Sequence, residues 1–333
     1  MKTRKTPTRN RKTPTRNRKT YRSSLRLNKT RRIRPTHKHR YQHNAGGKKT
    51  IIGSKMTKMS CSPKNGPSND FSCYTNDALL KLKNKWNSRH PDTIIHADNP
   101  KEIWELLGKY MNKTCQRESC WLIQDFAKGE MDELKQSFAP ASPEEWKKNP
   151  NEWLSSVDIM NVMKQYEKVY KCFDFFGPTP IDFDTKETDG VCVWEEICNL
   201  NLKQQQTNGK TKLGFIFNTD PHYKGGEHWI SLFVNIKKGT IFFFDSAGND
   251  IPREVQVLVD RIIKQGQDMN IDFKFDKNYP VEHQYGNTEC GVYSLFFIVH
   301  MLEDKITGNY LKTHILKDKY MEKFRKVYFN SVL

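Results

Sequence analysis

The sequence predicts an α+β domain in the C-terminal half of the chain, with a mixed, mainly antiparallel sheet flanked by helices. Two alternating apolar runs, joined by a short Gly-containing turn, predict a β-hairpin over residues 230–244. A polar turn followed by a long apolar run that starts at Cys290 predicts a helix near the C-terminus. Capping residues before apolar stripes predict further helices between residues 70 and 126. We therefore expect a tail at 1–60, a helical region at 61–145 and the α+β domain at 146–333.

The positive charge of the chain is concentrated at its N-terminus. The formal net charge is +18, but residues 1–50 hold nineteen Lys or Arg and no acidic residue, which leaves 37 basic and 38 acidic residues for the rest. Residues 5–18 repeat one heptapeptide, Lys-Thr-Pro-Thr-Arg-Asn-Arg, twice. This composition cannot bury a core, so we expect the tail to be disordered. It is either a solvated or targeting tail, or a segment that binds nucleic acid without sequence specificity.

The cysteines do not indicate a disulfide-rich secreted scaffold, because eight of them are scattered over 333 residues. The N-terminus lacks the apolar segment of a signal peptide, and the longest apolar run is shorter than a membrane crossing needs. We therefore expect a soluble protein in a reducing compartment. The spacings do not match those of zinc sites, so we expect no metal and assign free thiols to four cysteines, Cys61, Cys73, Cys115 and Cys120.

The helical region contains two recognisable helix starts. One precedes the apolar stripe of residues 76–82, and in the other Asn99 is a capping residue with Pro100 at the first helical position. Residues 147–150 break the pattern, and the segment Trp153–Met160 opens a further helix. These patterns place helices on both sides of the expected boundary at residue 145.

The α+β domain continues with alternating runs. Strands are predicted at 213–217, 230–236, 240–244 and 271–275, with an amphipathic helix at 253–263. Residues 204–210 are polar and end in an Asn-Gly pair, which predicts an exposed loop with a turn. Residues 305–333 form a helical stretch with a mixed charged face, to which we assign no chemistry.

Cys290 is the candidate nucleophile. Its expected place at a helix N-terminus favours the thiolate, since the unpaired N–H groups and the helix dipole stabilise an anion. The hairpin brings the start of its first strand beside the end of its second, so His228 and Asp245 can meet although seventeen positions separate them. Asp245 can then orient the imidazole while its other nitrogen faces Cys290. His222 is a competing base that lacks a strand to orient it.

These residues resemble a known family. The order His-Trp, Asp-Ser, and Gln followed six positions later by Cys-Gly is similar to the ubiquitin-like-protein-processing cysteine proteases, the clan of SUMO proteases and adenovirus protease. The resemblance implies a papain-like fold of the SUMO-protease type, with His228 as base, Asp245 as its partner, Cys290 as nucleophile and Gln284 as oxyanion-hole donor. Residues 120–123 and 173–184 resemble the thiol proteases of large cytoplasmic DNA viruses.

The resemblance also implies how substrate binds. Proteases of this clan accept Gly-Gly before the scissile bond, and Trp153 and Trp229 would flank that backbone in a narrow tunnel; each is otherwise a core tryptophan. SUMO proteases have an acidic residue where this chain has Ser156, which weakens a SUMO-specific interpretation. Gly46-Gly47 in the tail is either a flexible linker or a self-processing site.

We therefore expect a cysteine endopeptidase that cleaves protein substrates after Gly-Gly and needs no metal or organic cofactor. The preferred interpretation is a viral maturation protease of structural polyproteins, found in the virion and host cytoplasm, whose residues 1–50 contact nucleic acid. The alternatives are a protease that removes SUMO or another ubiquitin-like modifier, in which case a soluble intracellular protein is expected, and a non-enzymatic nucleic-acid-binding packaging protein. No membrane association is expected.

Overall fold

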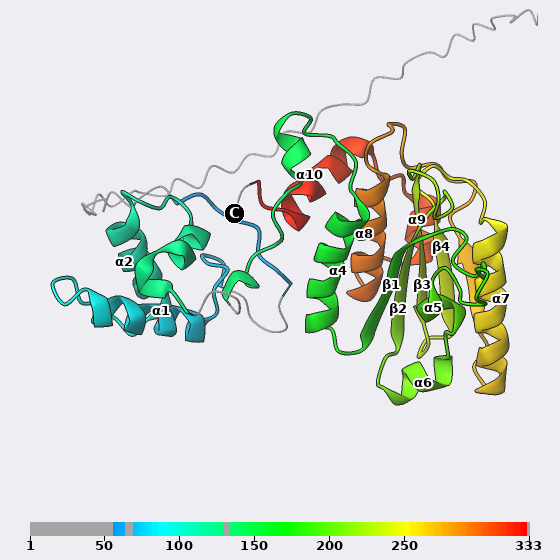
Figure 1. Ribbon diagram of the computed structural model, residues 1–333, viewed down its shortest axis with the longest axis horizontal. Helices are drawn as coiled ribbons and strands as arrows, with labels where there is room; N and C mark the ends of the chain where they lie inside the picture. Colours follow the sequence, from blue (N-terminus) through cyan, green and yellow to red (C-terminus); the bar gives the residue numbers. More distant parts are fainter. Residues whose placement is uncertain (1–55, 64–68, 130–133, 332–333) are drawn as a thin grey trace, which may run out of the picture. The chain divides into compact units, whose positions relative to one another are not determined.

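The computed structural model describes residues 56–63, 69–129 and 134–331. The heptapeptide repeat, Gly46-Gly47 and all but the last residues of the expected tail lie outside the described residues. Figure 1 shows a helical N-terminal region followed by a sheet with helices on both faces. Within the described residues, no helix is long and apolar enough to cross a membrane.

The N-terminal region is built on two helices that begin where their capping residues predict. Helix α1 spans Asn76–Arg89, and the side chain of Thr75 accepts a hydrogen bond from the backbone N–H of Ala78. Helix α2 spans Pro100–Met111, and Asn99 caps it through the N–H groups of Lys101 and Glu102. Two 3-10 helices follow, η1 (Glu118–Ile123) and η2 (Asp125–Ala127). Their apolar side chains form a core of their own with α1 and α2.

The cysteines of this region correct the expectation of free thiols. Cys61 pairs with Cys73, and Cys115 pairs with Cys120, with Cα atoms 5.1 and 5.6 Å apart. Cys192 and Cys198 form a third disulfide, whereas Cys172 and Cys290 are free. The expectation was wrong because spacing along the chain does not show which cysteines the fold brings within disulfide range.

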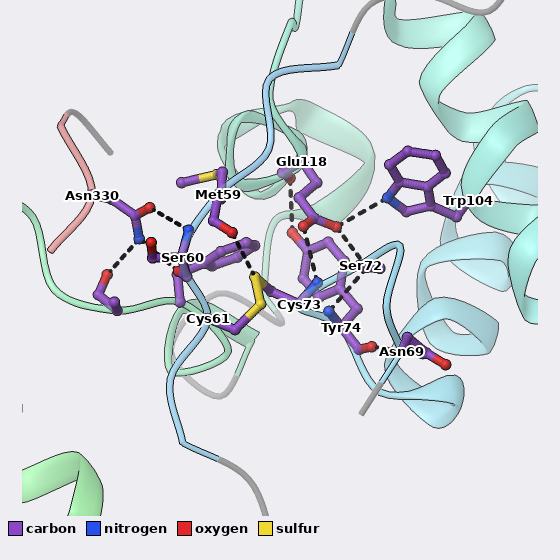
Figure 2. The surroundings of a disulfide bond; sticks show 12 residues. Met59, Ser60, Cys61, Asn69, Ser72, Cys73, Tyr74, Trp104, Glu118 and Asn330 are labelled. Atoms are coloured by element: carbon purple, nitrogen blue, oxygen red, sulfur yellow. Dashed lines mark hydrogen bonds between the residues drawn. A yellow bond between two sulfur atoms is a disulfide. The ribbon is translucent and has the colours of Figure 1, made fainter. Parts of the chain in front are cut away.

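Figure 2 shows that the Cys61–Cys73 disulfide lies between two hydrogen-bonded clusters. On one side, the buried carboxylate of Glu118 accepts hydrogen bonds from Ser72 Oγ, the Cys73 backbone N–H and Trp104 Nε1. On the other, the backbone N–H of Ser60 donates to Asn330 Oδ1, and Asn330 Nδ2 donates back to the Ser60 carbonyl. The disulfide therefore joins the helical core to a segment that pairs with the C-terminal end of the chain.

The C-terminal region contains a five-stranded sheet in the order β1-β2-β3-β4-β5. The strands are β1 (Phe173–Pro180), β2 (Lys212–Asn218), β3 (Trp229–Asn235), β4 (Thr240–Phe244) and β5 (Lys274–Lys277). Strand β3 pairs antiparallel with β2 and β4, while β1 and β5 add parallel to the two edges. The expected mixed sheet and hairpin are confirmed, but the sheet is not mainly antiparallel, because both edge strands pair in parallel and only two of the four strand pairs that the structure describes are antiparallel. The predicted strand at 271–275 begins three residues later.

Helices cover both faces of the sheet (Figure 1), because alternate strand residues are apolar on each side. One face packs against α4 (Ser156–Val169) and α8 (Cys290–Leu302), and the other packs against α7 (Arg253–Asp268). Phe233 and Phe242 point into the first core, and Leu232 and Phe243 into the second. This arrangement buries α8 almost entirely and fixes Cys290 at the edge of the core.

The remaining elements are short or lie at the periphery. They are η3 (Glu144–Lys147), α5 (Glu195–Cys198), α6 (Leu202–Thr207), α9 (Gly308–Thr313) and α10 (Asp318–Tyr328). Helix α6 occupies most of the polar segment expected as a loop, and the turn follows at Asn208 and Gly209, where the glycine has a φ of +78°. Helix α4 begins at Ser156, capped by Ser155, so Trp153 precedes it.

Candidate active site

The hairpin brings His228 and Asp245 together as expected. His228 directly precedes β3, Asp245 directly follows β4, and the pairing of Ser231 with Phe244 places these two ends side by side. The Nε2 atom of His228 lies 2.6 Å from Oδ1 of Asp245. The carboxylate of Asp245 is 3 % exposed and the imidazole 19 %, so the pair is largely shielded from water.

Asp245 is held in place by neighbours that the sequence did not indicate. The fully buried Asn278 accepts from the Asp245 N–H through Oδ1 at 2.9 Å and donates to the Asp245 carbonyl through Nδ2 at 2.7 Å. The backbone N–H of Ala247 donates to Oδ1 of Asp245 at 2.9 Å. These bonds fix the backbone and the carboxylate of Asp245 relative to His228.

Helix α8 brings Cys290 to the same site. It is the first residue of α8, 2 % exposed, and its thiol interacts with the imidazole of His228. Burial opposes the charge of His228, but hydrogen bonds with Asp245 and then with Cys290 outweigh it and raise the pKa of His228 to about 10. The imidazole is therefore held as an imidazolium between a carboxylate and a sulfur.

Gln284 lies next to this group of residues. Its Oε1 accepts from Ser246 Oγ at 2.7 Å, and its Nε2 donates to the Gly286 carbonyl at 2.9 Å. The carbonyl of Ser246 accepts from the N–H groups of His283 and Gln284, which ties this segment to the loop after β4. The competing base His222 is placed differently: its Nδ1 lies 2.7 Å from Asp182 Oδ2, in an exposed pair.

A groove of about 910 Å³ lies next to the candidate catalytic residues, since Trp229 lines it and directly follows His228. Trp153, Leu154, Gly226 and Trp229 are among the residues that line it, and Trp229 Nε1 donates to the Leu154 carbonyl at 3.0 Å. A Cβ added at Gly291, the residue after Cys290, would lie 3.0 Å from Leu154 and 3.3 Å from Trp229. Residues of the groove therefore lie close to the helix start that carries Cys290, and both tryptophans singled out from the sequence line the groove.

Arg325 is the main charged residue of the site that the sequence analysis missed. It lies on α10, in the stretch assigned no chemistry, and pairs with Glu289, the residue before Cys290. Both side chains are at most 5 % exposed. Glu289 offered a partial signal, since a carboxylate that becomes buried needs a cation, but the sequence showed neither its burial nor which cation would pair with it.

The geometry has the parts of a thiol hydrolase: a buried sulfur that interacts with an imidazole, a buried carboxylate hydrogen-bonded to that imidazole, and a groove whose lining residues adjoin the sulfur's helix start. The family model of the Ulp1 protease family, C-terminal catalytic domain, matches residues 157–332, just over half of the chain. That range begins at α4 and contains all four candidate catalytic residues.

Similarity to viral proteases extends beyond residues 157–332. The provisionally assigned thiol protease R355 of Acanthamoeba polyphaga mimivirus is 27 % identical over 297 residues, which cover 81 % of this chain and 93 % of that protein. A SUMO-1 cysteine protease of African swine fever virus is 27 % identical over 251 residues, covering 70 % of this chain and 90 % of that protein.

The crystal structure of the African swine fever virus protease has the same fold. It superposes with a TM-score of 0.61 at 20 % identity and covers 84 % of this chain and 98 % of its own. The expected SUMO-protease type of fold is therefore confirmed, and the packaging-protein alternative is wrong because the matched family is one of proteases. The chain belongs to the Ulp1 protease family and is a cysteine protease related to viral thiol proteases.

Proposed function

We propose that this protease is an endopeptidase that cleaves after Gly-Gly, with Cys290 as nucleophile, His228 as acid and base, Asp245 as its orienting partner and Gln284 as oxyanion donor. The observation that carries the assignment is the position of His228, which contacts Asp245 at 2.6 Å and also interacts with Cys290. The competing base His222 does not combine a carboxylate contact with a contact to a free thiol in the part of the chain that the structure describes. Its Nδ1 atom is paired with Asp182.

The reaction follows from that geometry. The thiolate of Cys290 attacks the scissile carbonyl carbon and forms a C–S bond, while His228 gives its proton to the leaving amine as the C–N bond breaks. Water then attacks the thioester, its proton passes to His228, and the acid leaves as the sulfur is released. Gln284 Nε2 carries two N–H groups, one of which donates to Gly286. The second, with the backbone N–H of Cys290, is the oxyanion donor.

The groove supports glycine before the scissile bond. The side chains of Trp153 and Trp229 line it, and Leu154 and Trp229, which are hydrogen-bonded to each other, leave little width beside Gly291. A substrate residue without a side chain fits such a channel better than any other. The charged side chains of Lys164, Glu187 and Lys224 also line the groove, so specificity upstream of the glycines is expected to be set by them.

The test is cleavage of peptides that share one sequence around Gly-Gly-Ala. Replacing the second Gly by Ala is expected to reduce kcat/KM by at least 100-fold, because a methyl group meets the channel walls, and replacing the first is expected to reduce it less. A SUMO conjugate assayed in parallel tests the alternative that the enzyme removes ubiquitin-like modifiers. Faster turnover of the conjugate than of any peptide would replace our proposal by that alternative.

The viral maturation role and the nucleic-acid contact belong to the same proposal. Support comes from the viral proteases that are similar to this chain and from the charge of residues 1–50. We expect the full chain to bind single- and double-stranded DNA with a steep salt dependence, and a chain lacking residues 1–50 to lose that binding. Equal affinity of the two chains at low salt would contradict it.

Mass spectrometry of the wild-type protein and a Cys290→Ala variant tests self-processing at Gly46-Gly47. An N-terminus at Lys48 in the wild type alone supports self-cleavage, and intact N-termini in both contradict it.

A further inference from the structure

We infer that Arg325 is a positioning residue that holds the nucleophile's loop and the inner wall of the substrate groove in their working geometry. The inference rests on the proposed assignment of Cys290 as nucleophile. Arg325 touches neither the imidazole nor the thiol in any contact that the structure describes. Its effect on catalysis is therefore exerted through Glu289 and through the backbone on either side of the active site.

The first part of the argument is the contact with Glu289. Arg325 Nε lies 3.0 and 2.9 Å from the two carboxylate oxygens of Glu289, and Nη2 lies 2.8 Å from Oε1. Arg325 is 5 % exposed and Glu289 2 %, so these are charge-assisted bonds in a dry environment. Because Glu289 precedes Cys290, the guanidinium fixes the residue through which the chain enters α8.

The second part is that the Glu289 carboxylate does not cap helix α8. Glu289 is the N-cap of α8, yet its side chain makes no capping hydrogen bond to the helix. The first N–H groups of a helix attract an anion, and a carboxylate beside them is a natural occupant. Arg325 draws this carboxylate away, which leaves the helix N-terminus to the Cys290 thiolate and to the oxyanion of the reaction.

The third part is the backbone on the substrate side. Arg325 Nη1 donates to the Glu152 carbonyl at 2.7 Å, and Nη2 donates to the carbonyls of Asn151 at 3.3 Å and Thr288 at 2.9 Å. Glu152 is followed by Trp153 and Leu154, which line the groove. One guanidinium thus bonds to the segment before the nucleophile and to the segment before the groove wall.

The contacts made by residue 325 require an arginine rather than a lysine. A contribution to stability alone does not account for them. The guanidinium carbon lies 4.5 Å from the centroid of the Trp146 ring, which supports the planar group while its donors reach five oxygens. A lysine has three donors on a single atom and cannot span these positions. Buried ion pairs are often no more stabilising than apolar packing, so their geometry is the better reason for this one.

Four variants separate positioning from simple stabilisation: Arg325→Met, Glu289→Gln, the double variant with both changes, and Arg325→Lys. In Arg325→Met the freed Glu289 carboxylate competes for the N-terminus of α8, so we expect kcat on the Gly-Gly-Ala peptide to fall at least 30-fold and KM to rise a few-fold. In the double variant a neutral amide replaces that carboxylate. We expect kcat to recover at least 10-fold over Arg325→Met, while KM stays raised.

Arg261→Met is the matched control. Arg261 also forks onto a carboxylate, Asp184, and donates to a carbonyl, that of Ile197, but it lies on α7 on the other face of the sheet. We expect Arg261→Met to lower the melting temperature with kcat unchanged. If Arg325→Met does not fold, Arg325→Lys retains the charge and is expected to fold with reduced kcat.

Three results would overturn the inference: an unchanged kcat in both Arg325 variants, no recovery in the double variant, or an equal kcat loss in Arg261→Met. Failure of the underlying assignment shows itself separately, because turnover would then persist in Cys290→Ser. Loss of turnover in Cys290→Ser is therefore the reference for the four variants at Arg325 and Glu289.

Discussion

The ion pair between His228 and Asp245 gives a quantitative test of the site, and Asp245→Asn is the change that probes it. This substitution removes the carboxylate charge and keeps the shape of the side chain. In the wild type, burial opposes the charge of His228, and the hydrogen bonds with Asp245 and Cys290 nonetheless raise its pKa from 6.5 to about 10. At about 1.4 kcal/mol per pKa unit, that net preference for the imidazolium is worth roughly 5 kcal/mol; it is what remains after burial has opposed the interactions with Asp245 and Cys290.

Losing the share that Asp245 supplies has two expected effects. The active ion pair of thiolate and imidazolium is lost as pH rises through the pKa of His228, so the alkaline limb of kcat/KM moves from near pH 10 toward neutral by roughly one pH unit or more. Because the imidazole also loses its orientation, kcat is expected to fall by about two to four orders of magnitude.

The assay is the pH profile of kcat/KM on the Gly-Gly-Ala peptide between pH 5 and 10.5, with iodoacetamide alkylation of Cys290 measured over the same range. Asp182→Asn is the control, because Asp182 makes a similar contact of 2.7 Å with His222 in an exposed pair. The alkylation profile of the control is expected to match the wild type. An unshifted alkaline limb in Asp245→Asn, or an equal shift in Asp182→Asn, refutes the reasoning.

Three further predictions follow from other contacts. Gln284→Ala removes the proposed oxyanion donor and is expected to lower kcat by about 10²- to 10³-fold with little change in KM, measured by steady-state kinetics; an unchanged kcat contradicts that role. Gly248→Ala places a Cβ 2.8 Å from the Glu282 backbone nitrogen at a φ of +71°, so urea denaturation should show a loss of about 1–3 kcal/mol, and a loss within 0.5 kcal/mol counts against it. Burial lowers the pKa values of His283 and His300 below 6.5, so the unfolded chain binds more protons and the free energy of unfolding falls as pH drops below 6.5, by at most about 1.4 kcal/mol per pH unit for each group. His300→Gln should reduce that slope in denaturation at pH 5 to 7, and a slope equal to the wild type would exclude His300 as a source.

The sequence allowed the contact between His228 and Asp245 to be predicted because it is a local property of a hairpin. Once β3 and β4 pair across a short turn, the residue before one and the residue after the other must be neighbours. The helix start at Cys290 was predicted for a similar reason, since a change from polar to apolar sequence marks it directly. Both features depend on residues close together in the chain.

The parts that were missed depend on contacts between distant segments. Arg325 and Glu289 are 36 positions apart, and Asn278 acts through backbone groups of Asp245 that are 33 positions away. The disulfides were missed for a different reason: their partners are only 12, 5 and 6 positions apart, but spacing along the chain does not show which of eight cysteines the fold brings together. Strand β5 was placed three residues too early because the alternating run begins at Ile271, whereas its pairing with β4 begins only at Lys274.

The most direct test of the central claim is covalent labelling with a Gly-Gly peptide that carries an electrophilic vinyl sulfone in place of the scissile bond. Peptide mapping by mass spectrometry is expected to find one adduct, on the sulfur of Cys290, formed slowly in His228→Ala and absent in Cys290→Ala. Among the described residues Cys172 is the other free cysteine and serves as the internal control. Labelling of Cys172 at a comparable rate, or equal labelling of Cys290 by a scrambled peptide without the two glycines, would contradict the account.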